Sequence, residues 1–312
     1  MSALENENVY TSVAALTRLR HSGAAFNYLP HQRVGSLLSG RRHSRLRGRG
    51  LDFDELRNYR PGDDVRNMDW RVTNRTGRPH VRVYNEERDR PVLTIVDQRM
   101  PMFFGSQLNM KSVVAAEVAA LTAWRVLAVG DRIGALLFND SQSIEVKPTR
   151  SERRVVGWLG DLAKMNNALS AKNLEPANAS ALDAALQKVE HSIGHDHLVI
   201  LVSDLFGFSN ATTNSIKRIR AHNDFICIQV CDPLERDISN ADSLVVSDGE
   251  RQLQLSPAKQ GLGKKFAASY DTSMTQMQKK MRHNEIPLLT VNTTEPVPGQ
   301  LQQLLSGAKR SL

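Results

Sequence analysis

From residue 92 onward, short apolar runs alternate with longer stretches of mixed polarity. Residues 92–96 and 198–203 are apolar runs of the kind found in strands buried on both faces of a parallel sheet. Residues 109–129 show a long helical pattern that ends at Gly130, and glycine commonly terminates helices. This alternation predicts an α/β fold, in which helices cover both faces of a mostly parallel, Rossmann-like sheet.

The same patterns predict the other elements of the chain. Further strands are predicted at 79–84, 132–138, 143–146, 224–231 and 286–291, and further helices at 10–20, 151–165, 179–192, 211–222 and 261–284. A small polar hairpin is predicted at 242–255, followed at the C-terminal end by a short helix. We therefore expect an Arg-rich N-terminal extension over residues 1–88, with an Arg- and Asp-rich motif at 47–88, and an α/β domain over residues 89–312.

Residues 50–70 differ from the rest, because acidic residues, arginines and turn formers follow one another with little hydrophobic periodicity. Pro61 and Gly62 suit the two central positions of a type II turn, since proline fixes φ and glycine adopts a positive φ. Asp63 and Asp64 are then expected at the turn exit. One interpretation of the segment is a network of ion pairs that joins Arg57, Arg60 and Arg66 to Asp54, Asp63, Asp64 and Asp69.

This motif resembles that of a known family. The run Asn58-Tyr-Arg-Pro-Gly-Asp-Asp-Val-Arg-Asn-Met-Asp-Trp70, followed by Thr76-Gly77 and Glu86-Glu87, is similar to the domain-of-unknown-function 58 family. The resemblance is dense over residues 47–97 and weaker to about residue 292. It implies a von Willebrand factor type A-like fold and a partnership with MoxR-type AAA+ ATPases in protein complex assembly or maturation, with no settled catalytic activity.

We therefore expect a non-catalytic adaptor or chaperone-like protein-interaction module. Aromatic and arginine side chains dominate the energetics of protein interfaces, so Tyr59 and Trp70 are the expected anchors. An exposed Trp70 would favour binding, whereas a buried Trp70 would be structural. The candidate partner-binding residues are Arg57, Tyr59, Arg60, Asp63, Asp64, Arg66, Asp69 and Trp70.

Two aspartates follow buried strands at the point where ligands collect in α/β sheets. Asp97 follows the strand at 92–96, and Asp204 follows the strand at 198–203. In von Willebrand type A domains, an Asp-x-Ser-x-Ser sequence at the first strand holds Mg²⁺ together with a threonine and a second aspartate. The resemblance assigns Asp97 and Asp204 to the two aspartates of this metal-ion-dependent adhesion site, with Ser180 in place of the threonine.

The chain departs from this metal-binding pattern at the two serines, whose positions Arg99 and Pro101 occupy. Neither side chain can ligate a metal, because arginine has no lone pair to donate and proline has no side-chain heteroatom. We predict a degenerate site in which Arg99 pairs with Asp97 and Asp204, so that an internal cation replaces the metal. No cofactor is expected. Two alternatives stay open: weak Mg²⁺ binding through Asp97, Ser180 and Asp204, and an Arg99 that points to solvent.

The formal net charge of the chain is +8, and residues 1–90 hold 17 arginines against 11 acidic residues. The first lysine is Lys111. Arginine binds carboxylates and phosphates bidentately, so this composition suits both acidic protein surfaces and nucleic-acid backbones. A nucleic-acid-binding protein is therefore an alternative, and its candidate basic patch is the cluster Arg41, Arg42, Arg45, Arg47 and Arg49.

A metal-dependent nuclease is the alternative with catalytic activity. Its acids would be Asp63, Asp64, Asp69, Glu86 and Glu87, with nearby arginines holding the phosphodiester backbone. Residues 1–90 lack the lysine that such a site commonly uses, and the chain shows no Walker A loop and no nucleophile elbow. We therefore predict that the protein is not an enzyme.

The chain has no apolar run of about eighteen residues and no basic segment at its start, so we expect neither a membrane span nor a secretory signal. The predicted location is the cytoplasm. Cys227 and Cys231 lie four residues apart on one predicted strand, which is too far for a disulfide. Both are expected to be free thiols.

Overall fold

The computed structural model describes residues 7–23, 51–86, 91–172, 176–236, 244–247, 252–255 and 262–307. The chain divides into two compact units. The first, called the α/β unit here, consists of Met1–Gln32 and Arg90–Leu312, and the second, called the hairpin unit, consists of Arg33–Asp89.

The α/β unit is built on a sheet with the strand order β10-β7-β6-β3-β4-β5 within the described residues. Every neighbouring pair is parallel except β4 and β5, which are antiparallel. Each side chain of β3, β4 and β6 is buried, as the apolar runs predict. The strands are β3 Val92–Asp97, β4 Ile133–Phe138, β5 Ser143–Thr149, β6 Leu198–Ser203, β7 Asp224–Cys231 and β10 Leu288–Asn292.

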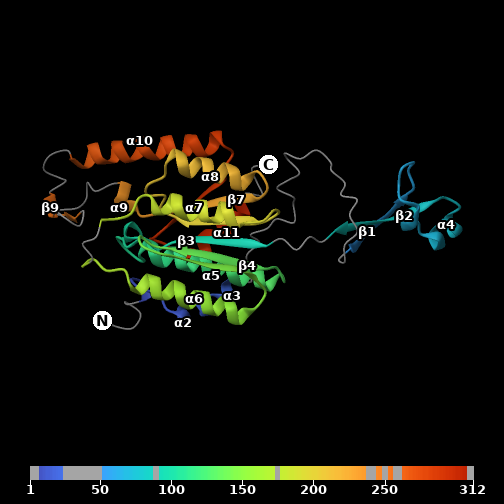
Figure 1. Cartoon of the computed structure of the whole chain (residues 1–312), viewed down its shortest axis with the longest axis horizontal. Helices are drawn as coiled ribbons and strands as arrows, with labels where there is room; N and C mark the ends of the chain where they lie inside the picture. Colours follow the sequence, from blue (N-terminus) through green and yellow to red (C-terminus); the bar gives the residue numbers. More distant parts are fainter. Residues whose placement is uncertain are drawn as a thin grey trace. The chain divides into compact units, whose positions relative to one another are not determined.

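Helices cover both faces of this sheet (Figure 1). One apolar cluster joins the sheet to α2, α5, α6 and α11, and the other joins its opposite face to α7, α8 and α10. The predicted α/β fold, a mostly parallel sheet between two helical layers, is therefore confirmed. The helices are α2 Val13–Arg18, α3 Arg20–Gly23, α5 Lys111–Ala128, α6 Glu152–Asn167, α7 Ala181–Ser192, α8 Asn210–Arg220, α9 Pro233–Arg236, α10 Leu262–His283 and α11 Val297–Gly307.

Residues 7–23 belong to the α/β unit, whereas the sequence analysis placed them in the N-terminal extension. The backbone N–H of Thr11 donates to Asn166 Oδ1 at 2.8 Å, and Trp124 Nε1 donates to the Leu16 carbonyl at 2.9 Å. Leu16 is fully buried in the core cluster of α5 and α6. The reason is physical: α2 is too short to be stable alone, and it buries Leu16 on the larger unit.

Asn166 also connects this N-terminal segment to the end of β3. Its Nδ2 donates to Gln98 Oε1 at 3.1 Å, and Gln98 Nε2 donates to the Ser112 carbonyl at 2.9 Å. The side chains of Asn166 and Gln98 are completely buried, so their amide groups need these partners. The network fixes the backbone directly after Asp97.

Glu117 on α5 predicts an unusual pH dependence of stability. Burial raises the pKa of its carboxyl from 4.5 to about 7, and repulsion from Glu7 adds to the rise. The unfolded chain therefore loses this proton at a lower pH than the folded chain does. The favourable contribution of Glu117 to the free energy of unfolding is complete below about pH 4.5 and is lost as the pH rises through 7. The total loss of stability is roughly 3 kcal/mol.

We expect Glu117→Gln to remove that dependence. Thermal and urea unfolding between pH 4.5 and 8.5 should show the variant more stable than the wild type at the alkaline end, with the difference shrinking toward the acidic end. A parallel pair of stability curves over this range would contradict the elevated pKa of Glu117.

The hairpin unit pairs β1 Leu51–Asn58 with β2 His80–Glu86 in an antiparallel ladder. The chain between them forms the 3₁₀ helix η2 Val65–Asn67 and the helix α4 Trp70–Thr76. The predicted type II turn is present, because Gly62 has φ 103° and the Asp63 N–H donates to the Arg60 carbonyl at 3.0 Å. Asp63 and Asp64 lie at its exit as predicted, whereas β1, η2 and α4 were not predicted.

Two further predictions concern the chain as a whole. Cys227 and Cys231 are both free thiols, as predicted, and Cys227 is fully buried. In the part of the chain that the structure describes, no helix combines the length and apolar character needed to cross a membrane.

Candidate functional site

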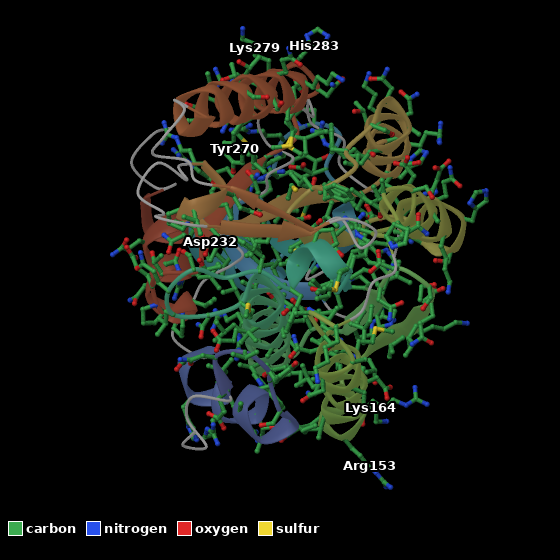
Figure 2. All side chains as sticks on the ribbon, turned by 90° about the vertical axis from the view of Figure 1, so that its left-hand side faces the viewer. Arg153, Lys164, Asp232, Tyr270, Lys279 and His283 are labelled. Atoms are coloured by element: carbon green, nitrogen blue, oxygen red, sulfur yellow. The ribbon has the colours of Figure 1, made fainter. Side chains whose placement is uncertain are left out.

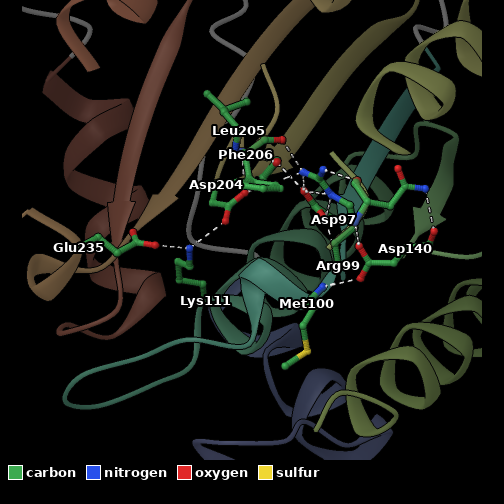
Figure 3. Close-up of polar contacts among 11 residues, drawn as sticks. Asp97, Arg99, Met100, Lys111, Asp140, Asp204, Leu205, Phe206 and Glu235 are labelled. Atoms are coloured by element: carbon green, nitrogen blue, oxygen red, sulfur yellow. Dashed lines mark hydrogen bonds and ion pairs between the residues drawn. The ribbon is translucent and has the colours of Figure 1, made fainter. Parts of the chain in front are cut away.

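An aspartate lies at or just beyond the carboxyl end of four neighbouring strands. Asp97 ends β3, Asp140 follows β4, Asp204 follows β6 and Asp232 follows β7. Parallel strands bring such residues to one edge of the sheet. This carboxyl edge faces the viewer in Figure 2, where Asp232 is labelled, and Figure 3 shows the polar contacts along it.

Arg99 forms a buried ion pair with Asp97 at the centre of this edge. The Asp97 carboxylate accepts from Arg99 Nη2 at 2.6 Å and from Arg99 Nε at 3.0 and 3.1 Å. It also accepts from the Arg99 backbone N–H at 3.0 Å and from Ser203 Oγ at 2.6 Å. Both charged side chains are completely buried. The predicted solvent-facing alternative for Arg99 is therefore wrong.

The remaining donors of Arg99 also have protein acceptors. Nη1 donates to the Asn178 carbonyl at 3.2 Å, and Nη2 donates to the Phe206 carbonyl at 3.0 Å. Nη2 lies 3.9 Å from Asp204 Oδ1, so the guanidinium bridges both predicted aspartates. The rings of Phe138 and Phe206 lie 5.5 and 5.8 Å from the guanidinium carbon, within the range of cation–π attraction.

Burial and ion pairing have opposite effects on the pKa values of Arg99 and Asp97. Burial disfavours charge on Arg99, but hydrogen bonding and attraction from Asp97, with attraction from Asp204, outweigh it and raise the pKa of the guanidinium. Burial likewise raises the pKa of Asp97, and the hydrogen bonds from Arg99 work against that rise. A buried charge in this setting depends on its partner.

Lys111, the first residue of α5, supplies a second buried cation that the sequence analysis missed. Its Nζ lies 2.8 Å from Asp204 Oδ2 and also binds the carboxylate of Glu235 on α9 (Figure 3). Burial would lower the pKa of Lys111, but attraction from Asp204 and Glu235 raises it. Burial raises the pKa of Glu235 despite the nearby ammonium. The edge therefore holds two internal cations among its carboxylates.

Asp140 and Asp232 fix the loops around these cations. Asp140 accepts from the Met100 N–H at 2.6 Å and from the Asn178 N–H at 2.7 Å, which joins the loops after β3 and before α7. Asp232 accepts from the Ser106 N–H at 2.8 Å and from Thr293 Oγ1. Burial alone would raise the pKa of Asp232, but these hydrogen bonds lower it.

Ser180 and Pro101 have no direct contact with the Asp97–Arg99 pair. Ser180 is exposed, and its Oγ donates to Asn178 Oδ1 at 2.7 Å. Pro101 lies in the 3₁₀ helix η3 Met100–Met102. The assignment of Ser180 to the threonine position of the adhesion site therefore stays a prediction.

These residues do not fit a divalent cation in their present arrangement. The carboxylate oxygens of Asp97 accept from Arg99 and Ser203, and Lys111 binds Asp204. Mg²⁺ requires several oxygen ligands around one point, and a guanidinium lies where they would converge. Among the described residues, no three His, Cys, Asp or Glu side chains are grouped to hold a metal.

Three apolar side chains border the carboxyl edge and are exposed: Phe104, Leu108 and Phe206, together called the apolar rim. Phe206 is 44% exposed, and its ring lies against Arg99. The Phe104 ring lies 5.9 Å from Lys111 Nζ. The buried cations thus support two exposed aromatic rings, an arrangement suited to contact with a protein partner.

Three aspartates of the hairpin unit, Asp63, Asp64 and Asp69, accept hydrogen bonds from its backbone N–H groups, and two of them form ion pairs with its arginines. Asp63 forms a bidentate pair with Arg57, at 2.7 and 2.8 Å, and accepts from the Arg60 N–H; these contacts lower the pKa of Asp63 to about 2. Asp64 caps η2 by accepting from the Arg66 N–H at 3.0 Å.

Asp69 caps α4 through the Arg71 and Val72 N–H groups. It pairs with Arg82 at 2.7 Å rather than with one of the three arginines predicted as its partners. The hydrogen bond from Val72, followed by that from Arg82, lowers the pKa of Asp69.

Trp70 is 60% exposed, which is the outcome that favours binding, while Tyr59 is half-buried. The side chains of Arg60 and Arg66 are exposed. Several predicted residues lie outside what the structure describes: the basic patch at residues 41–49, the acid Glu87, and the side chains of Asp54 and Glu86. The predicted partner-binding residues thus divide into the structural carboxylates, with Arg57 paired to Asp63, and the more accessible side chains of Tyr59, Arg60, Arg66 and Trp70.

Comparisons with known proteins give a family and distant relatives. Residues 55–276 match the family model described as "Protein of unknown function DUF58". The uncharacterized proteins Mb1516 of Mycobacterium bovis and Rv1480 of Mycobacterium tuberculosis are each 27% identical over 283 residues, which cover 89% of this chain and 86% of theirs. Among solved structures, the conserved hypothetical protein BatB from Bacteroides thetaiotaomicron matches with a TM-score of 0.41 and 11% identity, covering 71% of this chain and 100% of BatB.

Proposed function

The chain belongs to the DUF58 family, and on that premise we propose that it is a non-catalytic, cytoplasmic adaptor that recognises protein partners with a MoxR-type AAA+ ATPase. The observation that carries the proposal is the carboxyl edge of the sheet. There the completely buried Arg99 lies 2.6 Å from Asp97 and 3.9 Å from Asp204, and this pairing supports our proposal that an internal cation stands in place of the metal of the related adhesion site.

The chemistry of this edge supports recognition rather than turnover. Asp97 and Asp204 bind internal cations, and the Arg99 guanidinium donates to carbonyls and a carboxylate of the protein itself. A general base or a nucleophile must reach a substrate atom, and completely buried groups paired in this way cannot do so. The internal cations instead give the surrounding loops a fixed shape.

The two contact surfaces of the proposed adaptor are the apolar rim and the predicted partner-binding residues of the hairpin unit. Exposed aromatic side chains beside arginine are the usual centres of protein interfaces. The rim supplies Phe104 and Phe206, and the hairpin unit supplies Trp70 with Arg60 and Arg66. Partner recognition in this arrangement requires no bound metal.

The test is a binding measurement with the purified MoxR-type ATPase encoded in the same genome. We expect Phe104→Ala/Phe206→Ala to weaken binding by roughly tenfold or more, because each truncated anchor costs about 1 kcal/mol or more. The melting temperature should stay close to that of the wild type. Val129→Ala is the matched control, since Val129 is also an exposed apolar residue but lies at the other end of α5.

Binding should be measured by biolayer interferometry in Mg²⁺ and in EDTA, with nuclease present to remove nucleic-acid bridges. Equal binding in both metal conditions, with a loss in the rim variant alone, is the expected result. Absence of any interaction between the two wild-type proteins would overturn the proposed partnership. Binding that disappears with nuclease would instead assign the function to the arginine-rich N-terminal region.

A further inference from the structure

The acidic side chains of the hairpin unit that the structure describes bind the unit's own backbone and arginines. Between residues 56 and 82, where side chains are described, seven arginines accompany Asp63, Asp64 and Asp69. Asp63 pairs with Arg57, Asp64 caps η2, and Asp69 both caps α4 and pairs with Arg82. The internal contacts thus use every described carboxylate, while arginines are left in excess.

The other arginines of this region are exposed to solvent: Arg60, Arg66, Arg71, Arg75 and Arg78. Arg71 and Arg75 stand four residues apart on α4, so they lie on the same face of the helix. Trp70 begins that helix and is 60% exposed, and Val65 in η2 is 54% exposed. Leu56 at the end of β1 is exposed as well. The exposed surface of the hairpin unit between residues 56 and 82 therefore carries both positive charge and apolar or aromatic side chains.

We infer that this surface of the hairpin unit binds an acidic protein segment in which Asp or Glu residues alternate with apolar residues. Guanidinium groups bind carboxylates bidentately, and Trp70 is suited to an apolar side chain of the same segment. A nucleic acid would also match the charge. The exposed aliphatic side chains Val65 and Leu56, however, offer no stacking surface for bases and favour a peptide.

Binding of an acidic segment would give one contact surface of the proposed adaptor its ligand, and it therefore rests on the proposed function. Its test, however, does not involve the ATPase. The probe is a short fluorescein-labelled peptide of alternating Glu, Leu, Asp and Leu residues, titrated with the full-length protein and followed by fluorescence anisotropy. We expect saturable binding that weakens as NaCl rises, because exposed charges are screened by salt. The same peptide with Gln and Asn in place of the acids should not bind.

The decisive variant is Arg71→Gln/Arg75→Gln, which should weaken peptide binding roughly tenfold. Arg153→Gln/Arg154→Gln is the matched control, since it removes the same charge from two exposed arginines at the start of α6. Arg153 points away from the ribbon in Figure 2. Trp70 gives a second readout, because Trp124 and Trp158 are buried and a peptide-induced change in emission should disappear in Trp70→Phe.

Three results would overturn the inference: no saturable binding of the acidic peptide, equal binding by the two double-arginine variants, or tighter binding of a labelled single-stranded oligonucleotide than of the peptide. Whichever of these results is found, the proposed function is tested independently by measuring how the wild type and the Phe104→Ala/Phe206→Ala variant bind the ATPase. Loss of peptide binding with intact ATPase binding would reject the acidic segment alone.

Discussion

Replacing Arg99 with methionine is expected to lower the free energy of unfolding by about 3–5 kcal/mol. The substitution removes the guanidinium while keeping an unbranched side chain of comparable length. It leaves the Asp97 carboxylate completely buried, with only the Ser203 hydroxyl and the backbone N–H of residue 99 as donors. An uncompensated buried charge is the main source of the cost. Urea unfolding at neutral pH, followed by circular dichroism, measures it.

Two further variants identify the cause of that loss. Asp97→Asn/Arg99→Met removes both charges and should recover most of the stability, because a neutral pair carries no large desolvation cost. Arg218→Met is the surface control: Arg218 binds Glu190 through two nitrogens, but its side chain is 56% exposed, so we expect a much smaller loss than for Arg99→Met. An Arg99→Met loss no larger than that of Arg218→Met would contradict the internal-cation account.

The fold was predictable from the sequence because its signals are local. The runs at β3 and β6 are apolar at nearly every position, and α5 ends at Gly130, which has φ 83°. Such signals need no knowledge of distant residues. The Asp97–Arg99 pair was predictable for the same reason, since the two residues lie two positions apart at the end of a buried strand.

Lys111 and Glu235 were missed because their pairing is set by the sheet order rather than by spacing along the chain. They lie 124 positions apart and meet because both follow strands that end at the same edge. One signal was present: a lysine at the first position of a mostly apolar helix is unfavourable with respect to the helix dipole, which suggests a nearby anion.

The pairing of β1 with β2 in the hairpin unit was missed for a related reason. β1 and β2 pair across twenty-one intervening residues that form η2 and α4, so no short turn connects the two strands. Residues 51–54 of β1 alternate between apolar and polar residues, but Glu55 breaks this alternation where the pairing register with β2 shifts. Register between such distant segments depends on tertiary contacts, which a local pattern does not contain.

The largest functional change is expected from restoring the two serines of the adhesion-site pattern. Arg99→Ser/Pro101→Ser removes the guanidinium between Asp97 and Asp204 and adds two hydroxyl ligands, so the site should gain Mg²⁺ binding that the wild type lacks. Lys111 still lies 2.8 Å from Asp204 in that variant and repels a divalent cation. Adding Lys111→Gln should therefore tighten Mg²⁺ binding further.

Isothermal titration calorimetry with MgCl₂, paired with thermal unfolding, measures the gain. Because a ligand that binds only the folded state stabilises it, Mg²⁺ at ten to a hundred times its Kd should add about 1–3 kcal/mol to the variant and nothing to the wild type. Asp97→Asn in the same background is the matched control, since it removes one charged oxygen ligand and should abolish the effect. A folded triple variant that shows no heat and no stabilisation with Mg²⁺ would mean that Arg99 and Lys111 do not occupy a metal position. Their pairing would then be a structural feature of the carboxyl edge, unrelated to the adhesion site of the von Willebrand type A fold.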